Sequence, residues 1–166
     1  MTKKILVIAL IVLLTAPVWA KPAAKVGSEC PSFSLPTLSG EIINLDKYLG
    51  KNSIILSFFT SWSKSCVEET IFLEELHDKY HKKGLQVIGI SFDRKGNKLA
   101  SFISKNGLKY SILHDKKLKT LKKFRILIIP TLLVIDKKGN IKSIYVDFDK
   151  NVKESVAEEI KNLLIP

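Results

Sequence analysis

The sequence predicts one α/β domain built on a mixed β-sheet. Short stretches dense in Ile, Leu, Val and Phe, typical of buried strands, alternate with longer segments whose apolar residues recur at helical spacing. The last two strand-like stretches are joined by turn-forming residues, which indicates an antiparallel hairpin. The chain has 166 residues, which is enough for one domain with its own core.

The first twenty residues have the pattern of a secretory leader. Lys3 and Lys4 precede an unbroken apolar run over residues 5–14, and Val18 and Ala20 stand where a signal peptidase requires small residues. The apolar run is too short to span a hydrocarbon core of ~30 Å. We therefore expect a signal peptide over residues 1–20, cleaved after Ala20, with a retained membrane anchor as the alternative. The protein is then periplasmic or extracellular, and it meets the membrane only transiently through this leader.

The expected mature chain has a mobile polar lead over residues 21–26 and one folded domain over residues 27–166. Its first two strands, residues 33–35 and 41–45, form a hairpin through Ser39 and Gly40. Residues 53–59 form a strand buried on both faces. A helix follows over residues 64–83 and ends at Gly84. Its expected apolar face comprises Val67, Ile71, Phe72, Leu76 and Tyr80.

The second half continues the alternation of strands and helices. Asp115 is placed to cap a short helix. The first two core strands should be parallel, because a helical crossover links them. The expected strands are residues 85–92, 110–113, 131–135 and 141–146, and the expected helices are residues 96–105, 116–124 and 151–164.

The basic composition does not indicate a nucleic-acid site. The full chain carries a net charge of +11, and losing Lys3 and Lys4 with the leader would lower it to +9. Only Arg94 and Arg125 are arginines, whereas nucleic-acid sites depend on arginine for bidentate contacts. One lysine cluster fits either a solvated helix face or a contact with an acidic partner. It comprises Lys116, Lys117, Lys119, Lys122 and Lys123.

Three ordered segments resemble the thioredoxin-like proteins of the TlpA/ResA type. Residues 56–66, read as Leu-Ser-Phe-Phe-Thr-Ser-Trp-Ser-Lys-Ser-Cys, are similar to the strand, loop and helix start that carry a Trp and a Cys-x-x-Cys motif in that family. Residues 27–35 resemble the family's opening, and residues 129–139 resemble its cis-proline strand and turn. The resemblance covers residues 26–165. It implies a thioredoxin-like fold in which helices flank a central mixed sheet and a β-hairpin lies at the N-terminus.

The resemblance implies thiol-disulfide oxidoreductase activity without a cofactor, acting on exported thiol-containing proteins or peptides. In the family the first cysteine is a nucleophile at a helix N-terminus, and the second resolves the mixed disulfide. Here Ser63 takes the first position and Cys66 takes the second. An unactivated serine does not attack a disulfide at neutral pH, because its alkoxide is far too basic to form there. Thiol chemistry in this motif therefore depends on Cys66, with the Ser63 hydroxyl one turn ahead of it.

Three alternatives remain for this degenerate motif. Cys66 can be a small buried core residue. Ser-x-x-Cys is also similar to the Thr/Ser-x-x-Cys of peroxiredoxins, although Pro130 stands where those peroxidases carry an arginine. Finally, a redox-silent binding or assembly factor would use the groove of the family, to which the resemblance assigns Trp62, Ile129 and a cis Pro130.

Cys30 and the histidines complete the set of candidate residues. Cys30 can pair with Cys66 in a disulfide, resolve an oxidised Cys66, or stay free. His77 and His81 stand four residues apart on the first long helix, a spacing that can hold a metal. Their place near the helix C-terminus favours cationic histidines without a metal. We expect no metal site.

Overall fold

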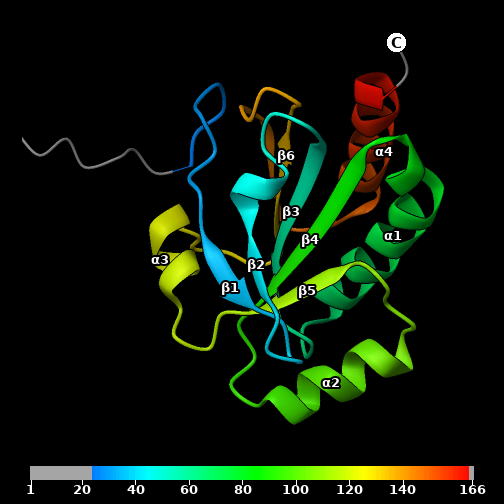
Figure 1. The fold of residues 1–166 in the computed structure, drawn as a ribbon. Coiled ribbons are helices and arrows are strands. Elements are labelled where there is room, and N and C mark those ends of the chain that lie inside the picture. The colour runs from blue at the N-terminus through cyan, green and yellow to red at the C-terminus, as the bar shows by residue number, and fades with distance from the viewer. Residues whose placement is uncertain (1–23, 165–166) are drawn as a thin grey trace, which may run out of the picture.

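The computed structural model of the protein describes residues 24–164, which fold around one central sheet (Figure 1). The strands are β1 (Ser34–Pro36), β2 (Ile42–Asn44), β3 (Ser53–Phe59), β4 (Leu85–Ser91), β5 (Ser111–His114), β6 (Thr131–Ile135) and β7 (Ile141–Val146). The α-helices are α1 (Lys64–Tyr80), α2 (Gly96–Lys105), α3 (Lys119–Phe124) and α4 (Lys150–Leu164), and two 3-10 turns are η1 (Leu45–Lys47) and η2 (His81–Lys83).

The central sheet is mixed, with the strand order β5-β4-β3-β6-β7. β3 runs parallel to β4, and β4 runs parallel to β5. β6 is antiparallel to β3, and β7 is antiparallel to β6. β1 and β2 form a separate antiparallel hairpin. The structure therefore confirms the predicted thioredoxin-like α/β architecture, including its N-terminal hairpin.

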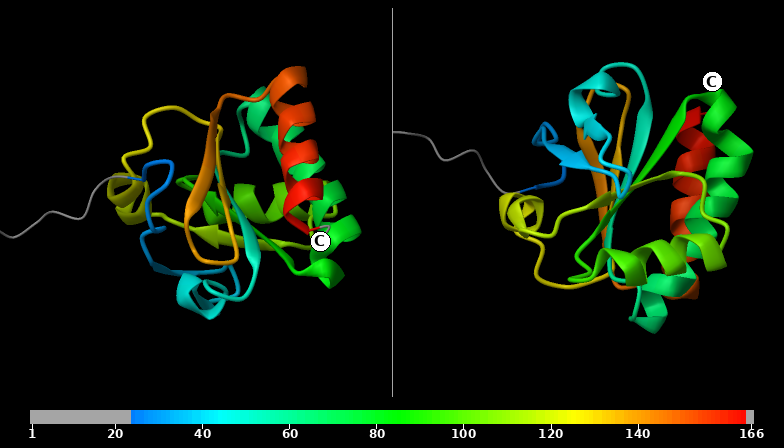
Figure 2. Two further views of the ribbon diagram at one scale, coloured as in Figure 1. Left: turned by 90° about the horizontal axis from the view of Figure 1, so that it is seen from above. Right: turned by 60° about the horizontal axis from the view of Figure 1, so that its bottom comes forward.

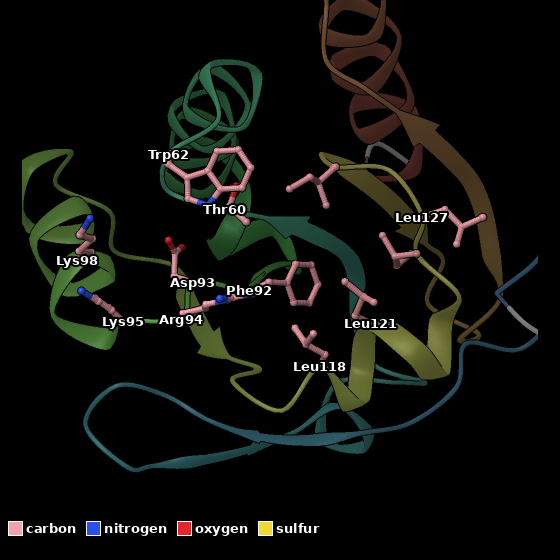
Figure 3. A pocket seen from close by; sticks show the side chains of 12 residues that line it. Thr60, Trp62, Phe92, Asp93, Arg94, Lys95, Lys98, Leu118, Leu121 and Leu127 are labelled. Atoms are coloured by element: carbon pink, nitrogen blue, oxygen red, sulfur yellow. The ribbon is translucent and has the colours of Figure 1, made fainter.

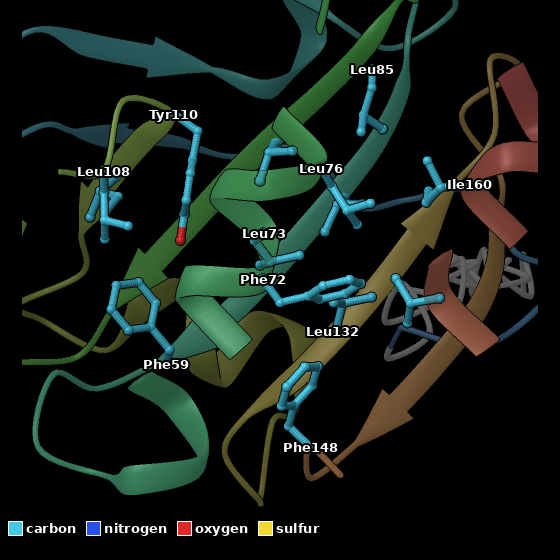
Figure 4. Close-up of a cluster of buried hydrophobic side chains, with 14 of the residues drawn as sticks. Phe59, Phe72, Leu73, Leu76, Leu85, Leu108, Tyr110, Leu132, Phe148 and Ile160 are labelled. Atoms are coloured by element: carbon cyan, nitrogen blue, oxygen red, sulfur yellow. The ribbon is translucent and has the colours of Figure 1, made fainter. Parts of the chain in front are cut away.

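Helices α1, α2 and α4 cover one face of the sheet, while the hairpin and α3 cover the other (Figures 1 and 2). Side chains alternate along β3, because successive residues of a strand point to opposite faces. Ile55 and Phe59 pack toward α1, in the cluster shown in Figure 4, whereas Ile54 and Phe58 pack toward the hairpin. The sheet thus separates two hydrophobic cores. This separation decides which of the candidate cysteines can meet.

Helix α1 is shorter than expected and buries a different face. The α-helix ends at Tyr80, η2 continues to Lys83, and Gly84 closes the segment with a φ of 93°. The expectation that Ile71 is buried is wrong, because 43% of its surface is exposed. The buried stripe instead contains Cys66, Glu69 and Leu73. A glutamate inside this stripe interrupts the apolar pattern by which the face was assigned.

Helix α3 begins at Lys119, three residues later than expected. Leu118 has a φ of 55°, which is outside helical geometry. The carboxylate of Asp115 accepts hydrogen bonds from the backbone N–H groups of Lys119, Thr120 and Leu121, at 2.9, 2.7 and 3.1 Å. Asp115 therefore caps this helix as predicted, but residues 116–118 form a turn between the cap and the helix.

The predicted signal peptide, residues 1–20, and residues 21–23 of the polar lead lie outside the described residues. From residue 24 to residue 164, no helix combines the length and the hydropathy that crossing a bilayer requires.

Candidate functional site

Ser63 lies where the loop after β3 enters α1. It is the N-cap residue of that helix, with extended backbone (φ −83°, ψ 132°), and its side chain makes no capping hydrogen bond. Its hydroxyl lies 3.3 Å from that of Ser65. A helix N-terminus favours negative charge on a side chain placed there. The position thus suits an anionic nucleophile, but it carries an alcohol.

Cys66 lies one turn into α1 and has no exposed surface. It packs in the core on the helical side of the sheet, together with Phe59. Burial raises the pKa of the Cys66 thiol; the Thr60 backbone and the Ser63 hydroxyl act in the opposite direction, and negative charge on Glu69 adds to the rise. The thiol is therefore both inaccessible and predominantly protonated at neutral pH.

Cys30 lies on the other side of the sheet, in the core beneath the hairpin. Both cysteines are free and buried. Burial raises the pKa of Cys30 to about 12, with the Lys123 ammonium acting weakly in the opposite direction. Because the sheet stands between the two cores, the structure does not bring Cys30 to Cys66. It offers no support for a disulfide between them or for Cys30 as a resolving partner.

The Ile129–Pro130 peptide bond is cis and directly precedes β6. β6 pairs with β3, and the loop that carries Trp62 follows β3. Ile129 and Trp62 consequently line one cleft, which has a volume of about 530 Å³ (Figure 3). Two of the three residues to which the resemblance assigned a groove thus line this cleft, and the third, Pro130, is buried and adjoins it through its bond to Ile129.

The cleft is apolar inside and basic at one rim. Its remaining apolar lining comes from the end of β4 and from the α3 segment, and its basic rim comes from the start of the segment that leads into α2. The indole of Trp62 is 76% exposed, and the side chain of Leu127, on the opposite wall, is 94% exposed. The apolar residues are Phe92, Leu118, Leu121, Ile126 and Leu127, and the basic residues are Arg94, Lys95 and Lys98.

Asp93, which the sequence analysis did not select, holds the loop that carries Trp62. Its buried carboxylate accepts three hydrogen bonds: from the Ser61 N–H at 2.9 Å, the Ser61 hydroxyl at 2.7 Å and the Ser91 hydroxyl at 2.7 Å. The loops after β3 and β4 are thereby tied together. The signal in the sequence is an acidic residue placed directly after a buried strand.

Glu69 is a second residue that sequence reasoning missed. It is fully buried, and burial raises its pKa to about 8, although the Ser57 hydroxyl, which donates a hydrogen bond to its Oε1, lowers it. Its Oε2 has no hydrogen-bond partner, and neither does the buried hydroxyl of Tyr110. Glu69 stands three residues after Cys66, so helical spacing alone would have placed both on one face.

His77, in the last turn of α1, and His81, at the start of η2, are not joined by a third potential metal ligand among the described residues. The rings of His77 and His81 stack with their centroids 4.9 Å apart. No group of three or more His, Cys, Asp or Glu side chains that could hold a metal was found between residues 24 and 164.

Known proteins are similar to this chain in sequence. The ResA thiol-disulfide oxidoreductase of Bacillus thuringiensis subsp. konkukian (strain 97-27) is 30% identical over 139 residues, which are 84% of this chain and 79% of that protein. ResA of Geobacillus kaustophilus (strain HTA426) is 32% identical over 124 residues, covering 75% and 71% of the two chains.

Solved structures of proteins described as thiol-disulfide oxidoreductases or isomerases are also similar to this chain. The crystal structure of a protein described as a thiol:disulfide interchange protein DsbE from Chlorobium tepidum has a TM-score of 0.80 and 25% identity, and the match covers 86% of this chain and all of that one. A solution structure from Bacteroides thetaiotaomicron, with a TM-score of 0.78 and 23% identity, shares the fold. The model of the AhpC/TSA family matches residues 26–144. The chain therefore belongs to the AhpC/TSA family and has the thioredoxin-like fold of thiol-disulfide oxidoreductases.

Proposed function

We propose that the protein is a redox-silent member of its family, which binds an extended segment of an exported, thiol-containing protein in the cleft between Trp62 and Ile129. One observation carries the proposal. The motif's single thiol, on Cys66, has no exposed surface, whereas the walls of the cleft beside it are open to solvent. A partner can therefore reach the cleft, but it cannot reach the thiol of Cys66.

Thiol chemistry would need a thiolate that can reach its target. In disulfide exchange, the attacking sulfur forms a new S–S bond as the old one breaks, and the departing sulfur takes the electron pair. Cys66 meets neither requirement, since burial raises its pKa and encloses its sulfur. The same enclosure argues against attack on a peroxide. Ser63 is better exposed, but it offers an alcohol in place of a thiol.

The backbone before Pro130 is suited to pair with an extended peptide. The carbonyl of Ile128 already accepts a hydrogen bond from the Thr131 hydroxyl at 2.6 Å. Within residues 24–164, no hydrogen bond was found for the N–H groups of Leu127 and Ile129. An incoming strand can supply carbonyl partners for such free donors. The apolar lining of the cleft would then receive the side chains of the bound segment.

A test of this proposal combines thiol labelling with peptide binding. We expect that neither cysteine of the folded protein reacts with an alkylating reagent at neutral pH, and that both react after unfolding. On an array of extended peptides, Cys66→Ala should bind as the unchanged protein does, whereas Trp62→Ala and Pro130→Ala should bind more weakly. Ile71→Ala is the matched control, because Ile71 is exposed on α1 and does not line the cleft.

Three results would each overturn the proposal. Rapid labelling of Cys66 in the folded protein would show a working thiol, and a mixed disulfide lost in Cys66→Ala would assign turnover to it. Equal binding by Trp62→Ala and Ile71→Ala would show that the cleft is not the binding site.

We also propose that the protein works outside the cytoplasm after removal of its leader. The support is the arrangement of Lys3 and Lys4 before the apolar run of residues 5–14, with Ala20 at the cleavage position. N-terminal sequencing of the protein recovered from the exported fraction should give Lys21 as the first residue. A protein that retains residues 1–20 would instead be held at the membrane.

A further inference from the structure

We propose that the folded domain has a binding surface for anionic lipid bilayers, at α3 and the segment that follows it. This surface, the α3 face below, comprises Lys119, Lys122, Lys123, Arg125, Leu127 and Ile128. It extends beyond the transient membrane contact expected for the leader. It takes a different ligand from the proposed peptide binding, and it shares only Leu127 with the lining of the peptide cleft.

The apolar part of the α3 face is unusually open to solvent. Leu127 is 94% exposed and its neighbour Ile128 is 56% exposed. Both line a groove of about 260 Å³ together with Val146, which is 49% exposed, on the edge strand β7. Large apolar side chains that gather on a surface mark a contact with another molecule or with a membrane.

The charged part of the α3 face directly precedes these apolar residues in the sequence, and Arg125 lines the same groove. Lys119, Lys122 and Lys123 are exposed, because α3 buries Thr120 and Phe124 instead. The Lys123 ammonium donates a hydrogen bond to the Ser32 carbonyl, which leaves Lys119 and Lys122 as the freer cations of the helix. No acidic residue occurs between Asp115 and Asp136 in the sequence. Among the ion pairs found within residues 24–164, none involves a residue of α3. The lysines of α3 therefore form no ion pair within the described residues, and the carboxylate found at this helix is that of Asp115, which caps its N-terminus.

This combination matches an anionic bilayer better than a folded acidic partner. Lysine is a flexible point charge, which suits mobile headgroups rather than the fixed bidentate geometry of arginine sites. Each basic residue held near an anionic membrane contributes about 1 kcal/mol, and apolar side chains beside it can enter the boundary between headgroups and acyl chains. The α3 face supplies both kinds of residue within one short segment.

Docking at this face would place the peptide cleft at the membrane surface. Leu127 lines both the groove beside Val146 and the cleft beside Trp62. A domain resting on Leu127 and Ile128 would hold the cleft near the headgroups. Its accessible partners would then be polypeptides at or close to the membrane.

The test is sedimentation of the mature chain, which begins at Lys21, with lipid vesicles. Vesicles of equimolar phosphatidylcholine and phosphatidylglycerol are compared with vesicles of phosphatidylcholine alone. We expect Lys119→Glu/Lys122→Glu to weaken binding to the anionic vesicles by roughly tenfold or more, and Leu127→Ser/Ile128→Ser to weaken it as well. The control is Lys137→Glu/Lys138→Glu, which changes the net charge equally in the exposed β6–β7 turn, at the other end of β6 from Pro130.

All variants begin at Lys21, so the leader makes no contribution to binding, and thermal unfolding followed by circular dichroism checks that each variant is folded. Binding that is equal on both vesicle types would overturn the proposal, and so would equal losses in the control and the α3 variants. Binding to soluble polyglutamate as tight as to vesicles, and unchanged in Leu127→Ser/Ile128→Ser, would assign the lysines to an acidic protein and also overturn it.

Discussion

At the scale of single residues, Glu69 is the carboxyl group whose pKa the fold raises, among the described residues. It is enclosed beneath the motif with a single hydrogen-bond donor, the Ser57 hydroxyl, and burial raises its pKa to about 8. It is therefore largely neutral at pH 7, which limits its electrostatic effect on Cys66. A buried carboxyl group that stays protonated avoids most of the cost of burying a charge.

This raised pKa predicts that the protein loses stability as the pH rises from about 4.5 to about 8. In this window the unfolded chain releases the Glu69 proton while the folded chain retains it, so the free energy of unfolding falls; above the folded pKa it levels off. The expected loss is roughly 3 to 5 kcal/mol. Urea unfolding across this range should show the decline. Glu69→Gln should flatten it, and the exposed control Glu154→Gln should not.

The two cysteines show what the sequence could and could not predict about single residues. The motif fixed the place of Cys66 at the start of α1, since a Trp and a helix-forming segment surround it. Nothing in the sequence assigned Cys30 and Cys66 to opposite sides of the sheet. The alternation along β3 defines two faces, but only the packing of the hairpin and α1 shows which cysteine lies on which.

At the scale of elements, Asp93 links the two loops that form one wall of the cleft. Replacing it with alanine would leave the Ser61 N–H and the hydroxyls of Ser61 and Ser91 without their acceptor. An unsatisfied buried group costs about 1 to 3 kcal/mol. We expect Asp93→Ala to lower the free energy of unfolding by this order and to speed hydrogen exchange at the Ser61 amide. Ser91→Ala, which removes one donor, should have a smaller effect, and unchanged exchange in Asp93→Ala would contradict this role.

The sequence predicted most elements, but not the surfaces that they form together. α2, β3, β6 and β7 have their expected bounds, because strong apolar runs and turn residues define them. The predicted buried face of α1 was wrong, because Glu69 lies among the residues that this helix buries. The cleft was foreseen only through Trp62, Ile129 and Pro130. Its other walls come from segments far apart in the sequence, whose contacts no local pattern encodes.

At the scale of the whole molecule, the motif differs from a Cys-x-x-Cys motif only in the oxygen that Ser63 carries in place of a sulfur. The helix N-terminus at Ser63, the thiol of Cys66 and the cis Pro130 remain around an intact sheet. The proposed redox silence would then follow from the side chain of Ser63 rather than from a change in the fold. The two positions lie one helical turn apart, so a second sulfur at the N-cap would stand near the first.

Ser63→Cys should therefore restore dithiol chemistry. A thiol at the N-cap of α1 is stabilised as thiolate by the helix N-terminus, which lowers thiol pKa values into the range of about 3.5 to 7.5 in active motifs. We expect the variant to form an internal disulfide on oxidation and to reduce insulin disulfides, with mass spectrometry of alkylated protein as the first readout. Ser65→Cys is the matched control, because cysteines adjacent in sequence bridge only with strained geometry. If Ser63→Cys stays reduced and inactive like that control, the loss of redox function lies deeper in the site, and the buried environment of Cys66 itself prevents exchange.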